Sequence, residues 1–167
     1  RALGQLAAAA ILDGRAPGEA LALVERAREL ERRERLQPGQ HTIVLDDAEG
    51  AALGRAGRFG DAARVLEGAI DLADEVGWTP AWPAMTLAHI HVCTGRTDAL
   101  RALGDRLAVH KGVISASITR ALGALMKTAA DLLGAPQDGP GLVRELEGRV
   151  DELEREVGWH NLRGRVL

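Results

Sequence analysis

The stretch GRFGDAARVLEGAIDLADEV, residues 57–76, decides the fold. Glycine adopts left-handed backbone angles without steric cost, so Gly57 is suited to end one helix. Asp61 follows after a short spacer and suits the first turn of a second helix, where exposed backbone amides favour negative charge. Apolar residues then recur at steps of three and four, which indicates an amphipathic α-helix. The apolar positions are Ala62, Val65, Leu66, Ala69, Ile70, Ala73 and Val76.

The same Gly-Arg marker occurs on both sides of this stretch. Gly14 and Gly95 also precede an arginine, a short spacer, an acidic residue and an alanine, and the three glycines are 43 and 38 residues apart. The sequence Glu-Val-Gly-Trp at 75–78 recurs at 156–159, which is 81 positions later. Two independent markers thus give a period of about 40 residues, which is typical of helical repeats.

Periodicity extends the helical interpretation along the chain. Hydrophobic residues make up 46% of the chain and aromatic residues only 2%, so the core must consist of Ala, Leu, Val and Ile. Ala and Leu are strong helix formers, and strand-like alternation is absent. The expected helices are at roughly 2–13, 19–36, 43–56, 61–76, 83–94, 98–110, 114–133 and 141–157.

Short turn signals separate these helices, so successive helices should pack antiparallel. We therefore predict an all-α protein, an α-solenoid of about four antiparallel helix pairs in a single helical-repeat domain over 1–167. The expected units are approximately 2–37, 41–78, 81–111 and 113–158. Arg1 opens partway into a helix and the last seven residues resemble an unfinished element, so we interpret the chain as an excerpt of a larger protein.

Charge and cysteine content limit the function classes. The chain has 21 Lys and Arg against 24 Asp and Glu, mixed along its length, for a formal net charge of −3. Neither the clustered basic face of a nucleic-acid binder nor a polybasic membrane patch is present, and no apolar run is long enough to span a membrane. The single cysteine, Cys93, fits a reducing cytoplasm. We expect a cytoplasmic protein without direct nucleic-acid or membrane binding.

The pattern resembles tetratricopeptide repeats. In that family a small residue in the first helix meets an alanine of the second, followed by a large apolar residue and a further alanine. The matching residues are Gly50, Leu53, Gly57, Ala62, Leu66 and Ala69 in the second unit, Ala20, Val24 and Ala27 in the first, and Ala88, Gly95, Ala99 and Leu103 in the third. The long Ala-, Leu- and Arg-rich repeats look like those of large bacterial regulators, such as LuxR-type activators and antibiotic-pathway regulators.

The resemblance also implies where a ligand would bind. First helices line the concave groove of such arrays, and their groove positions fall on five candidate binding residues. These are Asp47, Arg55, Trp82, Met85 and His89. The fourth unit would add Ala124, Thr128 and Asp131. Trp82 could anchor a partner, because Trp is over-represented among interface hot spots.

Catalytic and metal-binding interpretations are weaker. His89 and Cys93 are four residues apart, a spacing that can hold zinc, but His91 points away and no second ligand cluster exists. The acids Asp46, Asp47 and Glu49 resemble a magnesium motif, yet the simpler interpretation is the N-terminal turn of a helix. No nucleophile motif or phosphate-binding loop is present. We expect no enzyme activity, no cofactor and no metal.

Two functional hypotheses follow from the sequence. The first is a protein-interaction or scaffold domain of a bacterial regulatory protein, which binds a protein or peptide segment, or a second copy as a homodimer, through its groove. The alternative is a domain of a transcriptional regulator that senses a small-molecule or peptide effector. The sequence does not identify the partner.

Overall fold

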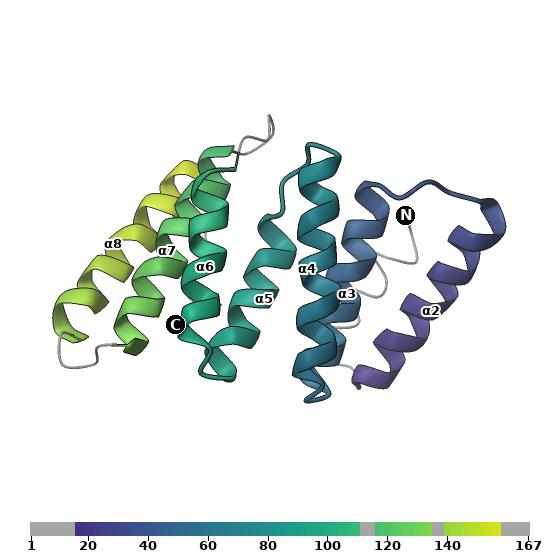
Figure 1. Ribbon diagram of the computed structural model, residues 1–167, viewed down its shortest axis with the longest axis horizontal. Helices are drawn as coiled ribbons and strands as arrows, with labels where there is room; N and C mark the ends of the chain where they lie inside the picture. The colour runs from purple at the N-terminus through teal and green to yellow at the C-terminus, as the bar shows by residue number, and fades with distance from the viewer. Residues whose placement is uncertain (1–15, 111–115, 135–138, 158–167) are drawn as a thin grey trace. The chain divides into compact units, whose positions relative to one another are not determined.

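The computed structural model describes residues 16–110, 116–134 and 139–157, and these residues form seven α-helices and no strand (Figure 1). The predicted all-α class is confirmed, and each of these helices occurs near its predicted bounds. The predicted helix at 2–13 lies outside the described residues. The helices are α2 (Pro17–Glu34), α3 (Gln40–Arg55), α4 (Phe59–Glu75), α5 (Ala81–Cys93), α6 (Thr97–Ala108), α7 (Ala116–Gly134) and α8 (Gly139–Val157).

The Gly-Arg marker forms the turn between α3 and α4 as predicted. Gly57 has a φ of 75°, its N–H donates to the Gly54 carbonyl at 3.0 Å, and the Arg58 N–H donates to the Leu53 carbonyl at 2.9 Å. This pair of bonds satisfies two carbonyls at the end of α3. The Arg58 side chain then pairs with Asp61 at 2.8 Å in the first turn of α4. The marker therefore ends one helix and holds the start of the next.

The chain divides into two compact units, Arg1–Ile90 and His91–Leu167, and their boundary lies within α5. In the first unit α2 packs against α3, and α3 packs against α4 (Figure 1). In the second unit α6 packs against α7, and α7 packs against α8. The arrangement of all helix pairs in one solenoid stays a prediction.

The helices of the first unit run antiparallel where they pack. Along α2 and α3, Val24 contacts Ala48, and Ala20 contacts Ala52 one turn away. Between α3 and α4, Ile43 contacts Ala69 and Ala73, and the half-buried Trp78 covers this cluster. The core is made mainly of alanine and branched aliphatic side chains, which lets the helices approach closely. It follows the composition predicted from the sequence.

The second unit is held by a close approach of α6 and α7. Gly104 and Gly123 face each other, so that a Cβ added at Gly104 would lie 2.7 Å from the Gly123 carbonyl oxygen. Charged pairs flank this contact at the surface, with Lys127 Nζ 2.6 Å from Asp105 and Arg101 paired with Asp131. On the other side of α7, the buried Leu146 and Val150 belong to the inner face of α8.

Candidate functional site

Helix α3 presents three different faces to its neighbours in the first unit. Its buried Ile43 and Gly50 face α4, and its Asp46 and Glu49 face α2. Its Asp47 faces α5 and accepts a hydrogen bond from the Thr86 hydroxyl, with Oγ1 and Oδ1 2.7 Å apart. The periodicity of the helix therefore directs two adjacent acids to different partners.

Helix α5 runs beside α3 in the same direction. Thr86 contacts Asp47, and further along Ile90 lies against Gly54, where an added Cβ would be 3.4 Å from Ile90 Cδ1. The first contact joins residues 39 positions apart, which matches the sequence period of about 40. The middle of α3 therefore lies beside the middle of α5.

The environment of Asp47 disfavours its ionised form. Burial raises the pKa of Asp47 to about 6 from the usual 3.8, and the hydrogen bond from Thr86 only partly opposes this rise. Within the described ranges no ion pair joins Asp47 to a cation. The adjacent Asp46 has such a partner in Arg28; burial still raises the pKa of Asp46, while the hydrogen bond from Arg28 lowers it.

The raised pKa of Asp47 predicts a specific pH dependence of stability. Below about pH 4 the carboxyl is protonated in both folded and unfolded chains, whereas between about 4 and 6 only the unfolded chain releases the proton. Above about pH 6 the carboxyl is ionised in both states, and the loss of stability caused by its buried charge has reached its full size. Asp47→Asn keeps an oxygen for Thr86 and removes the charge. We expect it to raise the free energy of unfolding at pH 7.5 by about 1 to 2 kcal/mol, with no gain at pH 4.

Chemical denaturation of both proteins across this pH range measures that difference. Glu67→Gln is the matched control, because it makes the same charge change on the exposed surface of α4. It should shift stability by no more than about 0.5 kcal/mol at any pH. A constant difference between wild type and Asp47→Asn from pH 4 to 7.5 would contradict the assignment.

The remaining candidate residues lie on the same two helices. Trp82 is 41% exposed in the first turn of α5, Met85 is half-buried, and His89 is exposed. Trp82, Thr86 and His89 share one face of α5, because they are spaced by four and three residues. Arg55 is exposed at the C-terminal end of α3. We define the α3–α5 face as Asp47, Arg55, Trp82, Met85, Thr86 and His89.

Sequence reasoning missed Thr86, which connects the two helices of this face. Its hydroxyl lies 2.7 Å from Asp47 Oδ1 and 3.3 Å from the Trp82 carbonyl oxygen. Its position four residues after Trp82 was the available signal. A threonine in a mostly apolar helix needs a hydrogen-bond acceptor when it is half-buried.

The expected position of the three acids is wrong. Asp46, Asp47 and Glu49 lie in the middle of α3 and not in its N-terminal turn, because α3 begins at Gln40. The helix begins there because the Gly39 N–H donates to the Thr42 hydroxyl at 3.2 Å. The acids therefore face neighbouring helices, and the helix dipole does not account for them.

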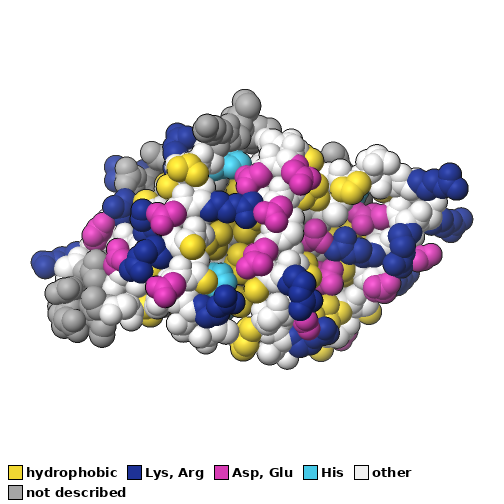
Figure 2. Space-filling view, viewed as in Figure 1, with side chains coloured by type: hydrophobic (Ala, Val, Ile, Leu, Met, Phe, Trp, Pro, Cys, Tyr) yellow, Lys and Arg dark blue, Asp and Glu magenta, His cyan; other side chains and the backbone are white. Residues whose placement is uncertain are grey.

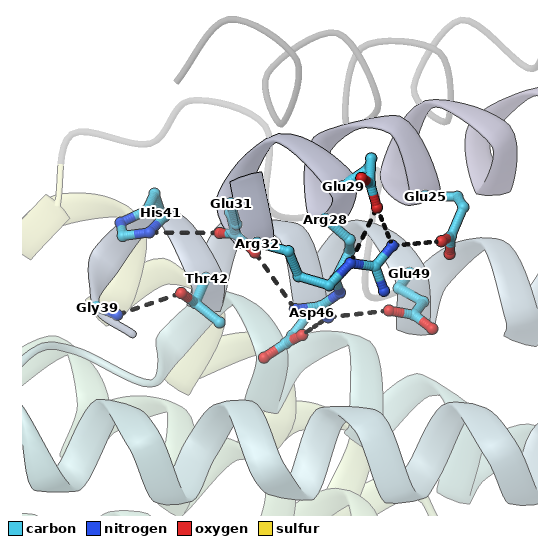
Figure 3. Close-up of polar contacts among 10 residues, drawn as sticks. All are labelled: Glu25, Arg28, Glu29, Glu31, Arg32, Gly39, His41, Thr42, Asp46 and Glu49. Carbon is cyan, nitrogen blue, oxygen red and sulfur yellow. Dashed lines mark hydrogen bonds and ion pairs between the residues drawn. The ribbon is translucent and has the colours of Figure 1, made fainter. Parts of the chain in front are cut away.

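Arg28 connects α2 to α3 through a polar cluster (Figure 3). Its guanidinium pairs with Asp46 and lies 3.0 Å from Glu49, and further along α2 Glu31 lies 3.3 Å from His41 Nε2. Arg32 is exposed and pairs with Glu25 and Glu29 of its own helix. Arg28 instead neutralises acids of the next helix.

The α7 positions implied by the resemblance are engaged with neighbouring helices. Thr128 is buried and accepts a hydrogen bond from Arg149 Nε of α8 at 3.1 Å, and Asp131 pairs with Arg101 of α6. Ala124 is half-buried on the same helix. Thr128 and Asp131 therefore connect α7 to its neighbours in the second unit, and we restrict the candidate surface to the α3–α5 face.

The histidines and the cysteine of α5 differ in exposure. His89 and Cys93 are exposed, whereas His91 is buried. Burial, together with the charge of Arg96, lowers the pKa of His91. Among the residues with described placement, no group of three or more His, Cys, Asp or Glu side chains could hold a metal ion.

The described surface mixes charge signs. Figure 2 shows basic and acidic side chains interleaved with hydrophobic ones over the face that it views. That face therefore presents no broad area of one sign. In the described part of the chain, no helix combines the length and apolar character needed to cross a membrane.

The described residues define an all-α protein whose first unit carries a mixed polar and aromatic face on α3 and α5. No family model matches the chain, and comparison with curated proteins and with solved structures finds no significant match. The α3–α5 face is therefore the feature of this molecule that points to a function.

Proposed function

We propose that this chain is a protein-interaction domain, built as a tetratricopeptide-like stack of helix pairs, that binds a segment of a partner protein on its α3–α5 face. Such a domain would serve as a scaffold in a bacterial regulatory protein. It needs no cofactor and carries out no reaction.

The parallel packing of α3 and α5 supports the proposed stack. In a stack of identical hairpins, first helices lie parallel, one repeat apart. The Asp47–Thr86 contact joins positions 39 residues apart in such helices. The antiparallel contact of α2 with α3 also agrees, because a second helix should pack on the first helix of the next hairpin.

The exposed Trp82 is the observation that carries the recognition function. A tryptophan with 41% exposure beside the half-buried Met85 offers a large apolar area that a partner can cover. Interfaces concentrate binding energy in such aromatic anchors, surrounded by weaker polar contacts. The α3–α5 face has this composition.

Loss of Trp82 should therefore weaken binding. Peptides selected on the wild-type protein from a random dodecapeptide library serve as probes, titrated by fluorescence anisotropy. We expect Trp82→Ala to weaken the selected peptides by about tenfold or more, as for a hot-spot residue. Because the residue is 41% exposed, the substitution should lower the thermal unfolding temperature by only about 2 to 4 °C, which leaves the protein folded during the titration.

Phe59→Ala is the matched control for this test. Phe59 is also an aromatic residue, is 38% exposed and lies in the first turn of α4, outside the six residues that define the α3–α5 face. It should leave peptide affinity unchanged. Equal effects of the two substitutions, or none from Trp82→Ala, would show that the peptides bind elsewhere.

A further inference from the structure

Asp47 has capacity for a further interaction. Its Oδ1 accepts the Thr86 hydroxyl at 2.7 Å, and in the described ranges this is its one polar partner. A carboxylate accepts about four hydrogen bonds when ionised, so Asp47 can accept more than the one that Thr86 donates. Its neighbour Asp46, one residue earlier, is neutralised by Arg28. The fold therefore compensates one of two adjacent acids and leaves the other without a described cation.

Because Asp47 is half-buried, the lack of a described cation beside it affects the stability of the protein. A half-buried carboxylate without a cation is unfavourable, because burial removes the hydration that stabilises its charge. Replacement by a neutral residue would improve stability, as expected above for Asp47→Asn. Residues that cost stability in the isolated protein are concentrated at functional sites.

Trp82 lies one turn from the hydroxyl that holds Asp47. Thr86 Oγ1 is 2.7 Å from the carboxylate, and Trp82 and Thr86 are four residues apart, so their side chains start from adjacent turns on one face of α5. An acid beside an exposed indole suits a cationic side chain, which can pair with the carboxylate while its alkyl stem or guanidinium covers the ring.

We propose that Asp47 receives a basic side chain of the bound partner segment, so that the partner presents an arginine or lysine to the α3–α5 face next to the group that covers Trp82. This inference depends on the proposed function and names the chemistry of its partner. The partner's cation would neutralise Asp47 in the complex, as Arg28 neutralises Asp46 within the chain. Pairing would compensate the buried charge only in the complex, which favours partners that carry the cation over those that do not.

The test uses the dodecapeptides that the wild-type protein selects and that lose affinity with Trp82→Ala. We expect these peptides to be enriched in a basic residue at a fixed distance from an apolar one. In a selected peptide whose basic residue is an arginine, this arginine is replaced by citrulline. Citrulline has nearly the same shape as arginine but carries no charge. Citrulline and Asp47→Asn should each weaken binding by about tenfold.

A double-mutant cycle separates direct pairing from other effects. If the two groups interact, citrulline should cost less than about threefold in the Asp47→Asn protein, because its partner is already absent. Asp47→Asn is a suitable variant, since it keeps the Thr86 hydrogen bond and should fold at least as well as wild type. Glu67→Gln, the same charge change on exposed α4, should leave the citrulline effect at its wild-type size.

The outcomes separate this inference from the proposed function. Trp82-dependent peptides that lack basic residues, or that bind wild type and Asp47→Asn equally, would overturn the inference and leave the recognition function intact. Failure to obtain any Trp82-dependent peptide would overturn both. Equal citrulline effects in wild type and Asp47→Asn would assign the peptide's charge to another acid and also overturn the inference.

Discussion

Gly104→Ala is expected to lower the free energy of unfolding of the second unit by about 3 kcal/mol or more. The added Cβ would lie 2.7 Å from the Gly123 carbonyl oxygen, 2.7 Å from Lys127 Cγ and 3.2 Å from the Lys127 backbone nitrogen. Two of these atoms belong to the backbone of α7, so no side-chain rotation relieves the overlap. The helices α6 and α7 must separate, which also loosens the packing of Leu103 and Leu107.

Chemical denaturation followed by circular dichroism measures this loss. Gly148→Ala in α8 is the matched control, because no atom lies within 4 Å of the added Cβ. There alanine should stabilise by about 0.5 to 1 kcal/mol, since it lowers the entropy lost when the helix forms. If Gly104→Ala were as well tolerated as Gly148→Ala, the close approach of α6 and α7 would be wrong.

Gly50→Ala should cost about 2 to 3 kcal/mol in the first unit. Here the added Cβ would meet the side chain of the fully buried Leu66, including Cδ2 at 2.6 Å and Cδ1 at 2.9 Å. The added Cβ meets a side chain and not the backbone, so truncation of Leu66 can relieve the overlap. Gly68→Ala in α4, with open space around its Cβ, should instead stabilise.

A second substitution tests this explanation. Leu66→Ala alone should destabilise by about 2 to 5 kcal/mol because it leaves a cavity. In the Gly50→Ala background the new methyl group partly fills that cavity, so the cost of Leu66→Ala should fall by at least about 1 kcal/mol. Strictly additive costs would show that Gly50 and Leu66 do not share one space.

The sequence predicted the helical architecture because it depends on local patterns. The apolar spacing in 61–76 and the glycines at the turns specify helices and their ends within a few residues, as Gly57 illustrates. The resemblance placed a small residue such as Gly50 against an alanine of the next helix, whereas the structure places Gly50 against Leu66. The close approach of Gly104 to Gly123 was also not predicted, because a glycine inside a helix indicates close packing only once the neighbouring helix is known.

The candidate site was predictable only in part. The resemblance pointed to Asp47, Arg55, Trp82, Met85 and His89, which lie on α3 and α5. Their role in binding stays a prediction. The different environments of Asp46 and Asp47 could not be read from the sequence, because both are acids of one helix and only their neighbours distinguish them. Arg28 and Thr86, which decide those environments, are distant in sequence.

Nuclear magnetic resonance mapping of a selected dodecapeptide on the labelled protein shows directly which helices the peptide contacts. Backbone amide shifts should change along α3 around Asp47 and along α5 from Trp82 to His89, and these changes should weaken together in Trp82→Ala. Shift changes confined to the exposed surface of α4, or to α6, α7 and α8, would contradict recognition by the α3–α5 face.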